Sequence, residues 1–405
     1  MVIACIDFSN NGHRMHLMCS VLKTILSTGN TAICITNDTE SIKHWMQNNY
    51  TAENNKIYYY TYQYVKPTEI HWNEKIHDIY IAWQYWQQYN LLLKKIETKY
   101  KLKIDAVLFN YIDVFLSCLF PKLLQKIVFN YRWFGLYIHT RYMRKFRHLG
   151  VQHKKSAITD IDYILKSDRC LGVGIFDAGI RSDLEYRLDK KVTLMPDVTD
   201  VSTNAMNYEL ANEIKQKATD RIIIGCIGIS YYTGVIDLIK LATACAGKNY
   251  FFVFCGQFDE GSYQHIPEID DRTLLSQFRN NPPENCLWRE GYLQDEFEYN
   301  AVFNSLDIIY MMYPEHYTSS NRLTKAAYFG KPVLAANQHC VGENVQKFKL
   351  GEVAAPGDIV EQLEKLNKLA ALLKRDKLPL SSWKDYYLLN NEESFHKQMK
   401  SLMGI

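Results

Sequence analysis

Two cations, Arg322 and Lys325, stand three residues apart in the stretch SSNRLTKAAYFG, where they would share one face of a helix. Gly330 is the expected end of that helix. Its candidate N-cap residues are Ser319, Ser320 and Asn321. The helix dipole disfavours a cation in the first turn, so we expect Arg322 to face an anion such as a diphosphate. Two solvated surface cations are the alternative.

Three further loops follow apolar runs and could contact a ligand. In IGISYYTGVIDL, Ser230 and Thr233 can cap the next helix or cradle a phosphate, and the two roles are compatible. CGQFDEGSY ends an apolar run at Gly256. In WREGYLQDEF, Gly291 and Tyr292 could present backbone groups to a flat ring. We interpret the acidic residues at the end of this stretch as helix caps rather than catalysts, because they suit the positive end of a helix dipole.

The N-terminal loop DFSNNGHRMH offers a second kind of site. Asn10, Asn11 and Gly12 form a polar turn before a helix, whose free N–H groups favour an anion or a sugar hydroxyl. An ordinary strand-to-helix turn is the alternative. The loop lacks the GxGxxG pattern of dinucleotide sites. His13 and His16 would share a helix face, but no third ligand accompanies them, so no metal site is predicted.

Residues 122–155 are strongly basic and rich in aromatic side chains. No Asp or Glu occurs between Asp113 and Asp160. Such a segment can rest on an anionic membrane surface. A basic cleft wall for a phosphate-bearing ligand is an equal alternative. Nucleic acid is not predicted, because no known binding motif accompanies the charges.

The elements that would carry these loops alternate twice between short apolar runs and amphipathic stretches. Apolar runs such as VIACIDF and TAICITN predict strands, and a length of 405 residues favours two domains. The pattern predicts an α/β fold of two Rossmann-like, doubly wound domains that face a cleft. Ligands of such sheets bind beyond the carboxyl ends of the strands. The boundary is expected around 196–204.

The composition is that of a soluble globular protein, with 47% hydrophobic and 22% charged residues and a net charge of +3. The ten cysteines occur singly, several of them within apolar runs. This favours reduced, buried thiols over disulfides or structural zinc. No signal peptide or membrane-spanning segment is recognisable. We therefore expect a cytoplasmic protein, with peripheral contact to the inner face of a membrane left open.

The second half of the chain resembles nucleotide-sugar-dependent glycosyltransferases of the GT-B type, in particular divergent bacterial members of the retaining family-four group. The resemblance rests on the order of five stretches, IGISYYTGVIDLIKLA, FFVFCGQ, REGYLQDEFEYNAVFNSLDIIYMMYP, SSNRLTKAAYFGKPVLAA and VGENVQKFKLGEV. The tail SSWKDYYLLNNEESFHKQM looks like the family's last helices, which return to the first domain. This implies an acceptor-side domain at 1–198, a nucleotide-sugar domain at 199–380 and returning helices at 381–405.

The resemblance further implies transfer of a sugar from a nucleoside diphosphate to a glycan or lipid-linked saccharide, with retention and without a cofactor or metal. A place in polysaccharide biosynthesis and a homo- or hetero-oligomer are compatible with it. Catalytic roles are expected for His139, Arg322 and Lys325. The acceptor would lie near Asn10, Asn11 and His13. The expected donor contacts are Gly12, Ser230, Thr233, Gly256, Gly291, Tyr292, Ser319, Ser320, Asn321, Arg322 and Lys325.

The sequence departs from the family pattern at the donor site. Thr233 stands where the family carries a phosphate-binding lysine, and no arginine lies near Ile229. In the Glu-x7-Glu motif, Tyr317 and Lys325 stand in the places of the two glutamates. Either Arg322 and Lys325 provide relocated phosphate contacts, or the chain is a catalytically silent scaffold that binds a glycan or a partner glycosyltransferase. An epimerase or phosphorylase on the same fold has no motif in its favour.

Overall fold

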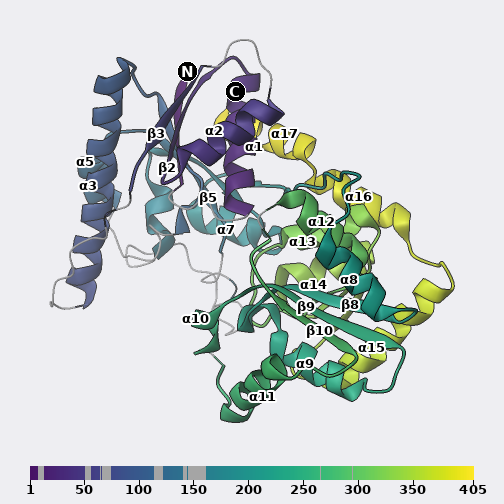
Figure 1. The fold of residues 1–405 in the computed structure, drawn as a ribbon. Helices are drawn as coiled ribbons and strands as arrows, with labels where there is room; N and C mark the ends of the chain where they lie inside the picture. Colours follow the sequence, from purple (N-terminus) through teal and green to yellow (C-terminus); the bar gives the residue numbers. More distant parts are fainter. Residues whose placement is uncertain are drawn as a thin grey trace. The chain divides into compact units, whose positions relative to one another are not determined.

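The chain forms two compact units in the computed structural model (Figure 1). Unit 1 comprises Met1–Val198 and Asn390–Ile405, and unit 2 comprises Thr199–Leu389. The expected returning segment 381–405 is thus divided between the units at 389/390. The structure describes residues 1–7, 13–50, 56–63, 65, 74–113, 122–139, 144, 161–264, 266–293 and 295–405.

Unit 1 is built on a parallel sheet, as the alternation of strands and helices predicts. Seven strands among its described residues pair in the order β3-β2-β1-β4-β5-β6-β7. They are β1 (Val2–Ile6), β2 (Thr31–Thr36), β3 (Ile57–Thr61), β4 (Ala106–Phe109), β5 (Trp133–Tyr137), β6 (Cys170–Ile175) and β7 (Val192–Leu194). The strand order reverses at the neighbouring strands β1 and β4, where open parallel sheets bind their ligands.

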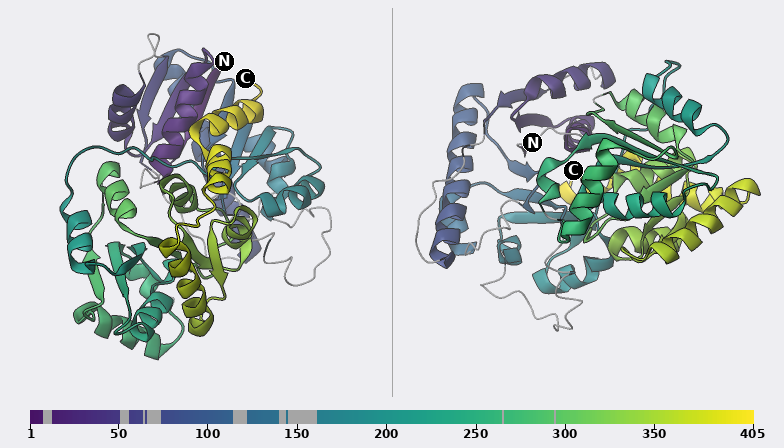
Figure 2. Two further views of the ribbon diagram at one scale, coloured as in Figure 1. Left: turned by 90° about the vertical axis from the view of Figure 1, so that its right-hand side faces the viewer. Right: turned by 60° about the horizontal axis from the view of Figure 1, so that its bottom comes forward.

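The helices of unit 1 cover both faces of this sheet and bury two apolar clusters against it. They are α1 (His13–Ser27), α2 (Thr39–Asn49), α3 (Glu74–Tyr100), α5 (Lys122–Val128), α7 (Arg181–Leu188) and α17 (Glu392–Met403). Short 3-10 helices occur at Ile161–Lys166 and Ala178–Ile180. Helix α17, the last helix of the chain, packs beside α1 (Figure 2).

Unit 2 repeats the architecture with a smaller parallel sheet. Six strands among its described residues pair in the order β10-β9-β8-β11-β12-β13. They are β8 (Ile222–Ile229), β9 (Tyr250–Phe258), β10 (Cys286–Glu290), β11 (Ile308–Met311), β12 (Val333–Ala336) and β13 (Gly351–Ala354). The strand order reverses at β8 and β11, so the two sheets are both doubly wound.

The helices of unit 2 again bury one apolar cluster on each face of the sheet. They are α8 (Glu209–Ala218), α9 (Val235–Ala244), α10 (Glu260–Tyr263), α11 (Ile269–Asn280), α12 (Glu296–Ser305), α13 (Asn321–Phe329), α14 (His339–Phe348), α15 (Ile359–Lys374) and α16 (Leu380–Asn390). A 3-10 helix, η3 (Tyr231–Thr233), follows β8. Helix α13 ends at Gly330 in the left-handed conformation, which confirms the predicted stop.

Part of the basic and aromatic segment 122–155 belongs to the core of unit 1. Trp133 and Phe134 lie in β5 and are buried, because the parallel sheet is covered on both faces. Arg144 is also buried and pairs with Asp177. Arg132 remains exposed. Apart from Arg144, residues 140–155 lie outside the described part of the chain.

The described cysteines are all buried, and none forms a disulfide. Burial raises the pKa of several of these thiols, for example Cys19 to about 12 and Cys286 to about 12. They therefore act as small apolar side chains in the core. Among the helices that the structure describes, none is both long enough and apolar enough to span a bilayer.

Candidate functional site

A cavity of about 640 Å³ lies in unit 2 at the carboxyl ends of β8, β9 and β10. Helices α12 and α13 each contribute one side chain to it, Tyr299 and Arg322. The remaining lining comes from the ends of β8 and β9 and from the segments that follow the three strands, namely Ile227–Ser230 with Thr233, Gly256–Gly261, and Tyr292 with Leu293. This is the position at which open parallel sheets bind their ligands.

The loop after β8 is held closed by Ser230 and Thr233. The Thr233 hydroxyl donates to the backbone oxygens of Gly228 and Ser230, at 2.9 Å each. It also accepts the Ser230 N–H at 3.2 Å, and the two residues form a reciprocal capping box around η3. The capping interpretation is therefore confirmed. Because the Thr233 hydroxyl is engaged in this way, it fixes the loop that lines the cavity.

Two glycines let the ends of β8 and β9 approach closely beneath the cavity. Gly228 and Gly256 have φ values of +91° and +105°, which side chains rarely adopt. A Cβ at Gly256 would stand 2.7 Å from the Gly228 nitrogen. A Cβ at Gly228 would stand 2.9 Å from Nη2 of Arg322. The guanidinium of Arg322 therefore lies directly over the backbone of the strand end.

Arg322 is a partly buried cation in the first turn of α13. Its Nη1 donates to the Tyr313 hydroxyl at 3.3 Å, and the guanidinium also lies against the Tyr299 hydroxyl. Burial raises the pKa of Tyr299 to about 12, so this hydroxyl stays neutral. No carboxylate of a described residue forms an ion pair with Arg322. A guanidinium of this kind, beside a cavity, is suited to an anionic ligand.

Lys325 has different surroundings, although it shares a helix face with Arg322. It is buried, with 2% of its surface exposed, so the interpretation as a solvated cation is wrong for this residue. Nζ donates to Asn300 Oδ1 and lies 3.4 Å from Glu296 Oε2. Burial lowers the Lys325 pKa, against the nearby charges of Glu296 and Asp200, which raise it. Lys325 is not among the described residues that line the cavity.

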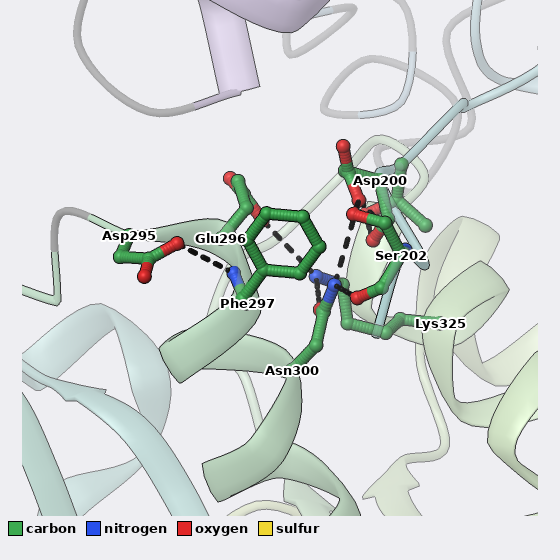
Figure 3. A network of polar contacts seen from close by, with 8 residues as sticks. Asp200, Ser202, Asp295, Glu296, Phe297, Asn300 and Lys325 are labelled. Carbon is green, nitrogen blue, oxygen red and sulfur yellow. Dashed lines mark hydrogen bonds and ion pairs between the residues drawn. The ribbon is translucent and has the colours of Figure 1, made fainter. Parts of the chain in front are cut away.

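The polar network around Lys325 joins helix α12 to the first residues of unit 2 (Figure 3). Asn300 accepts from Lys325 and donates through Nδ2 to the Ser202 backbone oxygen at 2.8 Å. The same Nδ2 lies 3.5 Å from Asp200 Oδ1. Asp295 caps α12 by accepting the Phe297 N–H, which confirms the capping interpretation for this residue of the acidic stretch. Lys325 thus stands among acidic and amide oxygens.

Of the other predicted donor contacts, some lie at the cavity and others do not line it. Tyr292 lines the cavity and is 53% exposed, and Gly291 precedes it with φ of +151°. Ser320 occupies the N-cap position of α13, without a side-chain cap hydrogen bond. The predicted contacts around the start of this helix are not among the described residues that line the cavity, namely Ser319, Ser320 and Asn321.

Of the residues predicted in unit 1, the structure describes His13 at the start of α1 and His139 after β5. His13 is the first residue of α1, and Asn10, Asn11 and Gly12 lie outside the described residues. His139 follows β5, and its N–H donates to Asp113 Oδ1 at 2.6 Å. The rings of His139 and Tyr111 lie edge to face, with their centres 5.5 Å apart.

Several site residues were not predicted. In unit 2 the cavity also includes Tyr299 and the carboxylates Asp259 and Glu260. In unit 1 Asp113 accepts both the Ile138 and His139 N–H groups. The available signal for Asp113 was its place as the last acid before a long acid-free stretch. For Tyr299 there was none, because tyrosine is abundant throughout this chain.

No protein-family profile matches the sequence, and no curated protein is detectably similar to it. Solved structures are similar over the whole chain. Sucrose-phosphate synthase from Thermosynechococcus elongatus superposes with a TM-score of 0.69 at 14% identity, with 100% of this chain and 98% of that chain covered. The Anabaena protein HepE, solved with UDP and glucose, gives 0.63 at 12% identity over 100% and 99%.

A third similar structure is WaaG, a glycosyltransferase involved in lipopolysaccharide biosynthesis, with a TM-score of 0.61 at 11% identity over 100% of both chains. These likenesses show the fold. Together with the two doubly wound sheets they establish that the chain has the GT-B fold of glycosyltransferases, as the sequence predicted. The cavity in unit 2 is the candidate functional site of this fold.

Proposed function

We propose that this protein is a glycosyltransferase that uses a nucleoside diphosphate sugar as its donor and binds it in the cavity of unit 2. The observation that carries the proposal is Arg322, a partly buried guanidinium without a described carboxylate partner, at the strand ends of a GT-B fold. HepE, which shares this fold, was solved with UDP and also with UDP-glucose. Both observations support a nucleoside diphosphate as the ligand.

In the proposed reaction, Arg322 contacts the diphosphate. Negative charge grows on the diphosphate as the bond to the sugar breaks, and a fixed cation stabilises that charge without reorganising. The glycine-rich strand ends let the phosphates approach the backbone beside the guanidinium. Ser230, Thr233, Gly256, Gly291 and Tyr292 remain the proposed donor contacts, with Ser319, Ser320 and Asn321 at the start of α13. That no metal is required stays a prediction.

The acceptor side is proposed for unit 1, near His13 and His139. Asp113 fixes the backbone at His139, so the imidazole would be presented after β5 in a defined position. On the basis of the resemblance, the acceptor is proposed to be a glycan or lipid-linked saccharide, and the donor's sugar is proposed to be transferred to it with retention. Polysaccharide biosynthesis is the corresponding pathway class.

We also propose that helix α5 contacts an anionic membrane surface. Its side chains Leu123 and Ile127 are each 67% exposed, one turn apart on the same face. Lys126 lies beside them and pairs with Asp168, and Arg132 is exposed nearby in the chain. Apolar side chains with flanking cations are the combination that binds anionic lipid surfaces. This proposal places the membrane contact on α5 rather than on the buried aromatic residues of β5.

A nucleotide panel tests the proposed function. We expect one of UDP, ADP, GDP, CDP or dTDP to raise the melting temperature of the full chain, and its sugar conjugate to be hydrolysed or transferred. Arg322→Ala should lower the affinity for that nucleotide about 10- to 100-fold, since a charge-assisted contact is worth about 1.5–3 kcal/mol. Arg221→Ala is the matched control, because Arg221 packs on Phe251 at the other end of β8.

The absence of any shift at millimolar nucleotide would contradict the proposal. It would favour the alternative of a catalytically silent GT-B scaffold that binds a glycan or a partner glycosyltransferase. Unchanged affinity in Arg322→Ala, with a nucleotide that does bind, would remove Arg322 from the donor site.

A further inference from the structure

Tyr299 lies between the two cations of helix α13. Its ring faces Lys325, whose Nζ stands 4.3 Å from the ring centre. Its hydroxyl lies against the guanidinium of Arg322, and its side chain lines the cavity. One aromatic side chain from α12 therefore touches the buried lysine on one side and the cavity arginine on the other.

Lys325 is buried away from the cavity and does not reach a ligand bound there. The side chain is 3% exposed, and Nζ is directed to Asn300 and Glu296 on α12 (Figure 3). A buried ammonium needs such partners, because an unpaired one would be strongly destabilised. Lys325 therefore holds α13 to α12 at the level of Tyr299.

Arg322 has only neutral oxygens to orient it among the described residues. Tyr313 accepts one of its hydrogen bonds at 3.3 Å, and the Tyr299 hydroxyl is the second group against it. A flexible side chain held by two tyrosines depends on the placement of both rings. Tyr313 is buried in the core, whereas Tyr299 is only partly buried. The Tyr299 ring is held by stacking on Phe303, with the ring centres 6.3 Å apart, and by the Lys325 cation over its face.

We propose that Lys325 is a positioning residue that holds the Tyr299 ring by a cation–π contact, so that Tyr299 and Tyr313 orient Arg322 into the cavity. This inference rests on the proposed function, because it assigns the orientation of the same diphosphate contact. Lys325 acts through Tyr299 and touches no substrate.

The same geometry explains why a lysine occupies this position. Glu296 and Asp200 both lie close enough to Lys325 to favour its charge, and Asn300 presents its oxygen to it. A carboxylate in place of Lys325 would meet two negative charges and an amide oxygen, and it would be repelled by the electron-rich face of Tyr299. The lysine is thus matched to α12 and to the segment after the unit boundary.

The test compares UDP with uridine on the full chain, since uridine lacks the phosphates that Arg322 would contact. If the nucleotide panel identifies another base, the nucleoside diphosphate and the nucleoside of that base replace UDP and uridine. In Lys325→Met we expect affinity for UDP to fall about tenfold, while affinity for uridine stays unchanged. Lys325→Arg keeps a cation over the ring and should recover most of the UDP affinity.

Lys331→Met is the matched control. Lys331 follows the Gly330 cap of α13 and ties this end of the helix to α12, because its Nζ donates to the Asn304 backbone oxygen at 2.8 Å. The structure records no contact of Lys331 with Tyr299 or Arg322. This variant should lose stability without changing the ratio of UDP to uridine affinity.

Tyr299→Phe keeps the ring and removes the hydroxyl, so UDP affinity should fall roughly two- to tenfold. The double variant Lys325→Met with Tyr299→Phe should lose less than the product of the two single effects, because both act through the same side chain. If the two effects on UDP affinity multiply fully in the double variant, Lys325 does not act through Tyr299.

Two results separate this inference from the proposed function. If Arg322→Ala weakens UDP but Lys325→Met binds it like the wild type, the positioning role is wrong and the donor site stands. If Arg322→Ala also binds UDP like the wild type, the diphosphate role of Arg322 fails and the inference fails with it. An equal loss of UDP and uridine affinity in Lys325→Met would show a merely structural role.

Discussion

The carboxyl group of Asp113 lies in an environment that opposes its charge. Burial raises the pKa of Asp113 to about 6, and this effect exceeds the opposite influence of the Ile138 and His139 N–H groups and of Arg14. Arg14 itself pairs with the buried Asp7 and lies over the Tyr111 ring, 4.2 Å from its centre. The group that fixes the His139 backbone is therefore one that titrates in the mildly acidic range.

The pH dependence of stability tests this environment. A carboxyl pKa above its ordinary value means that the folded chain binds the proton more tightly than the unfolded chain. The resulting stabilisation is present below about pH 4 and is lost as the pH rises to about 6. Compared with Asp113→Asn, the wild type should lose at most about 3 kcal/mol in its free energy of unfolding across this range.

Urea denaturation of both proteins at several pH values measures this difference. Parallel stability curves for the wild type and Asp113→Asn would show that the pKa of Asp113 is not raised.

At the scale of single elements, helix α5 combines an inner and an outer face within seven residues. Gln125 is buried, and its Oε1 accepts the Ser167 hydroxyl at 3.1 Å. Leu123 and Ile127 lie on the exposed face. The helix packs beside α3, whose Leu91 is 58% exposed (Figure 1). These exposed apolar side chains are the basis of the proposed membrane contact of α5.

Flotation with vesicles tests the membrane proposal for α5. The wild type should float with phosphatidylcholine vesicles that contain phosphatidylglycerol, and raised salt should weaken this binding. Leu123→Ser with Ile127→Ser should abolish flotation, because the apolar contact is removed. Leu388→Ser with Leu389→Ser is the control, since those leucines of α16 are 47% and 57% exposed. Flotation that both double variants retain would contradict a role of α5.

At the scale of the whole molecule, unit 1 is completed by the last helix of the chain. Phe395 and Met399 of α17 are fully buried in its apolar cluster. Leu402 packs on β6, where a Cβ at Gly172 would stand 2.8 Å from Leu402 Cδ1. The small residues of β6 therefore make room for α17, and the first and last helices of the chain belong to one core.

Hydrogen exchange can separate the two cores. Phe395→Ala should destabilise unit 1 by about 3–5 kcal/mol, because it opens a cavity in a fully buried cluster. Faster exchange is expected in β1 and α1, with β8 and β9 unchanged. Phe278→Ala in unit 2 is the reciprocal control, since Phe278 is 5% exposed within a different cluster. Uniform acceleration across both units in Phe395→Ala would contradict two separate cores.

The order of strands and helices could be predicted because it follows from the local spacing of apolar and polar residues. The run RIIIGCIG predicts β8, and Ser230 with Thr233 predicts the turn that follows it. Strand β5 was missed, because WFGLY is buried on both faces and shows no alternation of polar and apolar residues. Its flanking cations made it resemble a surface segment.

Helix α13, with Arg322 and Lys325, has some features that the sequence determines and others that only tertiary packing determines. Its extent, its glycine stop and the shared face of the two cations follow from interactions along the chain, so the sequence alone was sufficient for them. The contrast between the cations comes from α12, which brings Glu296 and Asn300 to Lys325 and Tyr299 to both. Burial and neighbouring charge depend on segments that are distant in sequence. Only the tertiary structure could therefore distinguish Arg322, which lines the cavity, from Lys325, which is buried.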